Sequence, residues 1–171
     1  LAIACLISTL IIGLPAAYGL ARHPGWLSRI LEEFISLPLA VPGLALALAL
    51  LQLYGSMKGF RVSWTFILVG HVLYTLPFMV RSILAVLASM DLKTLEEGAA
   101  SLGASPWQRF RDIVVPNAMP GILAGALTVV TLSIGEFNLS WMLHTPYLKT
   151  LPVGLAGPSP SMPLEVAFAH P

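Results

Sequence analysis

The sequence predicts an all-α membrane protein, and three observations carry that prediction. Of its 171 residues, 57% are hydrophobic and 10% are charged, whereas roughly 25% of residues are charged in ordinary globular proteins. The mean hydropathy is correspondingly high, at +0.85. Apolar runs of about 20 residues, long enough to cross a bilayer as helices, alternate with short charged segments. The expected architecture is a helical bundle forming one transmembrane domain over residues 1–171.

Composition and motifs also exclude several functions. The net charge of +1 and the lack of a basic, aromatic-rich patch argue against nucleic-acid binding. A single cysteine rules out an internal disulfide framework. No phosphate-binding loop of the form G-x-x-x-x-G-K-[ST] is present, and no histidine has a helical partner four residues away. We therefore expect no catalytic residues, no metal site and no cofactor, and we do not expect an enzyme.

The first apolar segment, residues 1–21, is expected to be a transmembrane helix. The alternative is the core of a signal peptide, since Ala16 and Ala17 resemble a cleavage site. No basic region precedes the segment, however, and its length suits a full crossing of the hydrocarbon core. A polar joint with His23-Pro24-Gly25 follows and should break the helix.

Three further segments are expected to cross the membrane, at residues 34–54, 62–87 and 117–143. In the first of these, alternating Ala and Leu are compatible with a strand, but the length favours a helix with its prolines near the entry. The predicted bundle therefore has about four transmembrane helices. The Pro- and Gly-rich tail after Leu143 should contain no further one.

The charged stretch 91–116, between the last two apolar segments, must lie in water. Its sequence indicates two short helices separated by a glycine turn. Thr94 is expected to be the N-cap of the first helix in a capping box with Glu97, and Gly103 should adopt the left-handed conformation that ends it. The second helix is expected to start at Ser105, with Pro106 at its first position and Gln108 completing another capping box.

The basic residues predict the orientation. Because consecutive transmembrane helices alternate direction, the joint near residue 23 and the stretch 91–116 lie on one side of the membrane. Six basic residues belong to that side and three to the other, which places 91–116 in the cytoplasm. The two groups are Arg22, Arg29, Arg81, Lys93, Arg109 and Arg111 against Lys58, Arg61 and Lys149.

Within this stretch, Glu97-Gly98-Ala99, Gly103 and Ile113-Val114-Val115-Pro116 resemble a known signature. Their spacing is similar to the cytoplasmic motif E-A-A-x3-G-x9-I-x-L-P of permeases from binding-protein-dependent ATP-binding-cassette importers. Gly98 replaces the usual Ala and should loosen the first helix by roughly 0.5–1 kcal/mol. Val115 replaces the usual Leu.

The resemblance implies the type I importer-permease fold, which usually has six transmembrane helices; the chain then holds about four and lacks the first and last. It also implies partners: cytoplasmic ATPase subunits, a second permease subunit as homo- or heterodimer, a periplasmic solute-binding protein and the lipid bilayer of a bacterial inner membrane. The stretch 91–116 would dock on the ATPase as a coupling helix. The coupling residues would be Glu97, Gly98, Ala99, Gly103, Ile113 and Pro116.

The solute path is expected to involve charged residues within the apolar segments. Glu136 and Arg81 should face protein or water, because charge in a membrane helix costs about 2.5–3.5 kcal/mol on insertion scales. Glu136 either contacts a cationic or zwitterionic solute or makes a structural pair with Arg81 or another polar group. The latter role is favoured.

The segments GEFNLSWMLHTP and TLPVGL resemble the permease subgroup serving spermidine and putrescine, 2-aminoethylphosphonate and ferric iron. A small charged solute is therefore expected. Two alternatives remain open at this point: a fragment of a secondary carrier, although no internal repeat is visible, and a structural membrane subunit that transports nothing.

Overall fold

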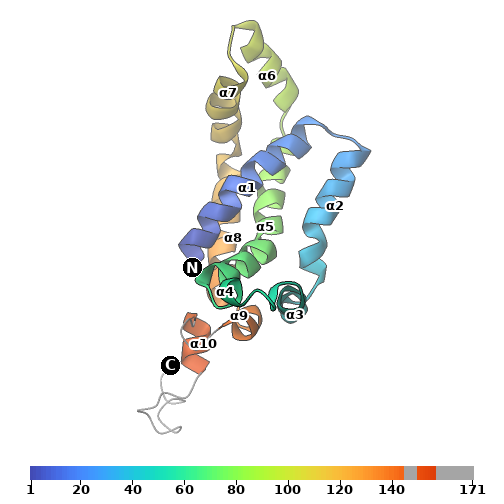
Figure 1. Ribbon diagram of the computed structural model, residues 1–171. Coiled ribbons are helices and arrows are strands. Elements are labelled where there is room, and N and C mark those ends of the chain that lie inside the picture. Colours follow the sequence, from blue (N-terminus) through green and yellow to red (C-terminus); the bar gives the residue numbers. More distant parts are fainter. Residues whose placement is uncertain (145–149, 157–171) are drawn as a thin grey trace.

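The computed structural model describes residues 1–144 and 150–156, and these are helical apart from short connections (Figure 1). The prediction of an all-α protein is confirmed. The elements, in chain order, are α1 (Ala2–Arg22), α2 (Trp26–Ala40), α3 (Gly43–Tyr54), α4 (Lys58–Arg61), α5 (Trp64–Ala88), α6 (Leu92–Ser101), α7 (Pro106–Arg109), the π-helical turn η1 (Phe110–Val114), α8 (Val115–Gly135), α9 (Asn138–Leu143) and α10 (Leu151–Ala156).

Helices α1, α5 and α8 pack along one another and form the core bundle (Figure 1). All three are long and apolar enough to cross a membrane, with α7, η1 and α8 forming one helix of 30 residues from Pro106 to Gly135. Helix α2 packs against α5 and also contacts α1, and α6 and α7 project together from one end of the bundle. This end is called the loop end below.

Small residues allow the core bundle to pack closely. On α1 the buried positions recur every four residues, so they form one face of the helix. On α8 a G-x-x-x-G pair turns toward α5, where a Cβ on Gly121 would meet the carbonyl oxygen of Ser82 at 2.5 Å. Such small-residue contacts bring membrane helices together. The residues are Cys5, Thr9, Gly13 and Ala17 on α1 and Gly121 and Gly125 on α8.

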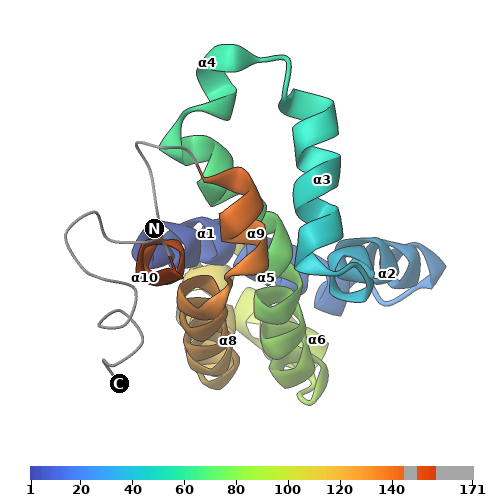
Figure 2. The ribbon, with the colours of Figure 1, turned by 90° about the horizontal axis from the view of Figure 1, so that it is seen from below.

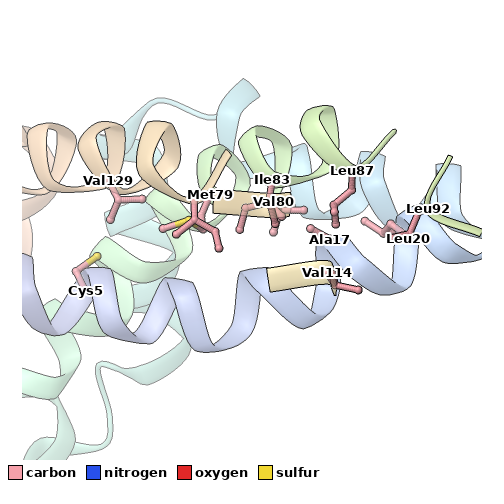
Figure 3. Close-up of a cluster of buried hydrophobic side chains, with 12 residues drawn as sticks. Cys5, Ala17, Leu20, Met79, Val80, Ile83, Leu87, Leu92, Val114 and Val129 are labelled. Carbon is pink, nitrogen blue, oxygen red and sulfur yellow. The ribbon is translucent and has the colours of Figure 1, made fainter. Parts of the chain in front are cut away.

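Aliphatic side chains fill the space between these small residues (Figure 3). Met79, Val80 and Ile83 of α5 lie at the centre and are fully or almost fully buried. Toward the loop end, Leu87 and Leu92 continue the same cluster. The core therefore reaches from the bundle into α6, which begins at Leu92.

The expectation of one helix over residues 34–54 is wrong. The segment belongs to α2 and α3, whose axes differ by 104°. The break follows Val41, which is extended with φ −101° and ψ 124°. The cause is Pro42, because a proline forces the preceding residue out of the helical region. Pro38 lies inside α2 and does not mark the entry of a helix.

The segment 117–143 is interrupted as well. Helix α8 ends at Gly135, Glu136 is extended with ψ 102°, and α9 begins at Asn138. Helices α3 and α9, each starting just after a break, lie side by side at the end opposite the loop end (Figure 2). They form the broken layer. Of the tail after Leu143, the structure describes His144 and residues 150–156, so the prediction for its remainder lies outside the described residues.

Candidate functional site

The first candidate is the projecting pair of helices at the loop end. Helix α6 begins at Leu92 with Asp91 as its N-cap, and Asp91 accepts hydrogen bonds from the Thr94 backbone N–H at 3.2 Å and from its hydroxyl at 2.6 Å. The prediction of Thr94 as the N-cap is therefore wrong, since Asp91 caps the helix three residues earlier. These bonds from Thr94, its hydroxyl first, hold the pKa of the Asp91 carboxyl below its usual value.

The glycine turn after α6 is confirmed. Gly103 has φ +86°, and among the described residues no other has a positive φ. The backbone N–H of Ala104 donates to the Ala99 carbonyl at 3.0 Å and that of Gly103 to the Ala100 carbonyl at 2.9 Å. This is a Schellman motif, in which a residue with a Cβ would be strained at the glycine position.

The second helix also starts as expected. The Ser105 hydroxyl accepts from the Gln108 backbone N–H at 3.3 Å, and the Gln108 side chain accepts from the Ser105 backbone N–H at 2.8 Å. The capping box is complete, with Pro106 at the start of the helix. This helix does not end in the loop, because it continues through η1 into α8. Two short helices are expected from the sequence, but the structure has one short helix, α6, followed by the start of the long helix Pro106–Gly135.

Most of the predicted coupling residues are accessible. Glu97, Gly98 and Gly103 are exposed, and Ala99 is half-buried. Glu97 pairs with Lys93 at 3.8 Å, with 67% and 85% of these side chains exposed. Ile113 is half-buried in η1, and Pro116 is exposed in the first turn of α8. Ile113 and Pro116 therefore lie along the long helix rather than at the glycine turn.

The sequence did not single out the apolar side chains exposed around this turn. Leu102 is 89% exposed and Trp107 65% exposed. Trp107 stacks on Phe110 with ring centroids 5.8 Å apart. The surface called the loop tip below consists of Leu102 and Trp107 together with Glu97, Gly98 and Gly103. Large exposed apolar side chains within a polar segment are typical of a protein contact surface.

The sequence also did not single out Glu96. This residue is buried, although it precedes the exposed Glu97. Its carboxylate accepts from the Tyr18 hydroxyl and lies 3.4 Å from Nε of Arg22. A signal was present in the spacing: Leu92 and Glu96 are four residues apart and share one face of α6.

The second candidate consists of Glu136 and Arg81, which the structure places in different surroundings. Glu136 lies at the break between α8 and α9, where its Oε1 accepts from the Leu139 backbone N–H at 3.0 Å. Arg81, on α5, donates from Nε to the Ser36 hydroxyl at 3.0 Å. Among the ion pairs found in residues 1–144 and 150–156, none joins Glu136 to Arg81. Glu136 acts as a cap on its own chain.

Close to this break lies a buried polar group that sequence reasoning missed. His71 of α5 is fully buried and contacts the Ser133 hydroxyl through Nδ1 at 3.1 Å and the Ser140 hydroxyl through Nε2 at 2.9 Å. Ser133 precedes the break and Ser140 follows it, so His71 holds both sides. Within the described ranges, no group of three potential metal ligands surrounds it.

Comparison with known proteins agrees with these features. Residues 9–146 match the family described as "Binding-protein-dependent transport system inner membrane component". A probable sulfate transport system permease of Chlorella vulgaris is 32% identical, covering 79% of this chain and 54% of the relative. A putative 2-aminoethylphosphonate transport system permease of Salmonella typhimurium is 29% identical, with coverage of 85% and 55%. The chain thus spans about half the length of these two relatives.

A third relative is matched over a larger share of its length. The molybdenum transport system permease of Haemophilus influenzae is 29% identical, covering 97% of this chain and 76% of the relative. These relatives are named as permeases and not as enzymes. Three of the helices described here are long and apolar enough to cross a membrane, and the bent pair α2 and α3 makes a fourth candidate span. The chain is a multi-pass membrane protein and belongs to the family of inner membrane components of binding-protein-dependent transport systems.

Proposed function

We propose that the chain is a transmembrane subunit of an ATP-driven importer, which forms part of the solute pathway and docks on a cytoplasmic ATPase through residues 91–116. One observation carries the proposal: α6 ends in the Schellman turn at Gly103 and projects from the bundle with the loop tip exposed (Figure 1). A helix of ten residues is marginal on its own. A partner surface over Leu102 and Trp107 would stabilise it.

The proposed partners are the ATPase subunits, a second permease subunit and a periplasmic solute-binding protein, in the inner membrane of a bacterium. Family membership supports this arrangement and disfavours a secondary carrier or a non-transporting structural subunit. It requires the loop tip to face the cytoplasm. A cysteine placed at Leu102 in a Cys5→Ala background tests this. It should react with an impermeant maleimide in inverted vesicles, whose cytoplasmic side faces outward, and not in right-side-out vesicles.

The coupling role is tested with Gly103→Val. Valine is strained at φ +86°, so the variant should still insert into the membrane but should lose solute uptake while ATP hydrolysis continues. Gly59→Val is the matched control, since a Cβ at this exposed residue of α4 meets nothing within 4 Å. Unchanged uptake by Gly103→Val in reconstituted vesicles would contradict the coupling role.

For the solute, we propose a small charged compound of the oxyanion class. Of the classes expected from the sequence, 2-aminoethylphosphonate is the one that a relative's name supports, and the other two relatives are named for sulfate and molybdenum. Polyamines and ferric iron do not occur in these three names. Uptake of labelled sulfate, 2-aminoethylphosphonate and molybdate should therefore exceed uptake of putrescine and ferric citrate, and the reverse order would contradict the assignment.

A further inference from the structure

We propose that Tyr18, Arg22 and Glu96 form an anchor that fixes α6 to α1, so that a displacement of α6 by the ATPase moves α1 by direct contact. This inference rests on the proposed function. It identifies three positioning residues that lie outside the signature of the coupling loop. It also predicts a route for the movement that differs from the one along the chain.

The three side chains form a closed set of contacts. Oε2 of Glu96 lies 3.4 Å from Nε of Arg22, and the Glu96 carboxylate accepts the Tyr18 hydroxyl hydrogen. The Tyr18 oxygen in turn accepts from Nη1 of Arg22 at 2.8 Å. Each member therefore contacts the other two. Tyr18 and Arg22 lie four residues apart on α1 and so present themselves on the same face.

Packing holds this set in place. The Glu96 side chain is 5% exposed. One turn before it, Leu92 is buried in the same cluster as Leu20 of α1. The Tyr18 ring lies against Phe110, with centroids 5.4 Å apart, so η1 supports the anchor as well. The contact between α6 and α1 is thus part of the core and not a chance meeting of surface side chains.

The neighbouring pair on the same helix provides a contrast. Lys93 and Glu97 are exposed, 3.8 Å apart and both on α6. Such a surface ion pair contributes little to stability, and because both residues belong to α6 it joins no two helices. Glu96 and Arg22 belong to different helices, and the Glu96 side chain is 5% exposed whereas that of Arg22 is 39% exposed. Removing Arg22 would leave the buried carboxylate without its charged partner, so the contact favours one arrangement of the two helices.

The chain itself joins α6 to the bundle only at its two ends. Ser89 to Asp91 connect it to α5, and Leu102 to Ser105 connect it to the long helix. Helix α1 lies 78 residues away in sequence from Glu96 at the Tyr18 contact. Without the anchor, a push on α6 would reach α1 through its packing on α5 and α8 and through the Leu92 contact. With the anchor, polar contacts pass the movement from α6 to α1 directly.

The experiment uses the importer assembled from this chain, its ATPase and its second permease subunit in proteoliposomes. ATP hydrolysis is measured together with uptake of labelled sulfate, 2-aminoethylphosphonate or molybdate, each in turn. Glu96→Arg should keep the ATPase bound but lower uptake per ATP by at least about fivefold, and the charge swap Arg22→Glu with Glu96→Arg should restore it to within about twofold. Glu33→Arg, an exposed position on α2, is the matched control and should behave as wild type.

A second measurement leaves the anchor residues unchanged. Spin labels at Gly19 and Lys93, both exposed, report the separation of α1 and α6 in a Cys5→Ala background. A narrow distance distribution, identical without nucleotide and with vanadate-trapped nucleotide, is expected. A change in this distance, or a charge swap that restores nothing, overturns the anchor even though the ATPase binds. If the ATPase does not copurify with the wild-type chain, the proposed function fails and the inference fails with it.

Discussion

The core bundle and the broken layer both pack through buried apolar side chains, but they differ in what is added to that packing. In the core bundle, α1, α5 and α8 meet through small residues and aliphatic side chains, as at Gly121 against Ser82. In the broken layer, α3 and α9 begin just after chain breaks, and an apolar cluster that includes Leu50, Leu139 and Leu143 packs them onto α5. Polar contacts are added at the break between α8 and α9, namely the Glu136 cap and the bonds of His71 to Ser133 and Ser140.

The difference shows what each region requires. Helices that pack along one another in lipid must approach closely over their whole length, and small side chains allow this. A helix that turns at membrane depth exposes backbone groups at the break, and these need partners because no water is available. Close packing should therefore control stability in the core bundle, and in the broken layer the hydrogen bonds at the chain break should add to the apolar packing.

The largest effect is expected in the core bundle, for Gly121→Leu. Its Cβ would meet the Ser82 oxygen at 2.5 Å and the Ile83 Cα at 2.9 Å, which are backbone atoms that cannot rotate away. We expect a loss of about 3 kcal/mol or more in the free energy of unfolding, measured by denaturant titration in mixed micelles. Gly19→Leu on α1 is the control, since its Cβ meets nothing within 4 Å. Equal stability of the two variants would refute control by close packing.

A smaller effect is expected in the broken layer, for His71→Leu. The substitution keeps the site filled but removes both bonds across the break between α8 and α9. Loss of buried partners should destabilise the protein by about 2 kcal/mol. Hydrogen exchange should rise most in residues 136–144. If exchange rose equally throughout α1, His71 would act on the whole bundle and the proposed division between the regions would be wrong.

Glu136 should give a smaller change again. Glu136→Ala removes the acceptor for the Leu139 N–H and should cost about 1 kcal/mol, as for other lost caps. Glu136→Gln keeps an acceptor oxygen, so stability and solute uptake should both stay near wild type. Loss of uptake by Glu136→Gln at unchanged stability would instead support direct contact between this carboxylate and the solute.

The smallest effect is expected at the loop end, from the pH dependence of the Asp91 cap. Because the pKa of Asp91 is lowered in the folded protein, the cap is fully effective above the ordinary aspartate pKa and is lost as the pH falls through the lowered value. Protection of the α6 amides, corrected for intrinsic exchange, should decline over this acidic range. Asp91→Asn should abolish the decline, since an amide oxygen accepts at any pH.

Local signals in the sequence were sufficient at the loop end. The turn at Gly103 and the capping box of Ser105 and Gln108 depend on neighbouring residues, and both are found as predicted. The N-cap was misplaced because Asp91 and Thr94 are both good caps, and the sequence does not show that α6 starts with Leu92. The break after Val41 was detectable in principle, from the restriction that Pro42 imposes.

Contacts between distant segments were not predictable. Nothing in the sequence near Glu96 shows that Tyr18 lies against it, and the neighbouring residue that fits the signature is the exposed Glu97. The possible pair of Glu136 and Arg81 is not formed: Glu136 accepts from the Leu139 backbone N–H, and Arg81 contacts Ser36 of α2. Which polar groups meet is decided by how the helices pack, and a single sequence carries little of that information.

The continuous helix from Pro106 to Gly135 has a mechanical consequence. At 1.5 Å per residue, its 30 residues make a rod about 45 Å long. If this rod tilted as a rigid body by about 10° at its loop end, its other end, next to Glu136 and α9, would swing by roughly 8 Å. The π-helical turn η1 lies near the loop end of the rod, and a bend there would tilt the part of the helix that follows it. Because the rod is long, a small rotation at its loop end becomes a large displacement at the broken layer.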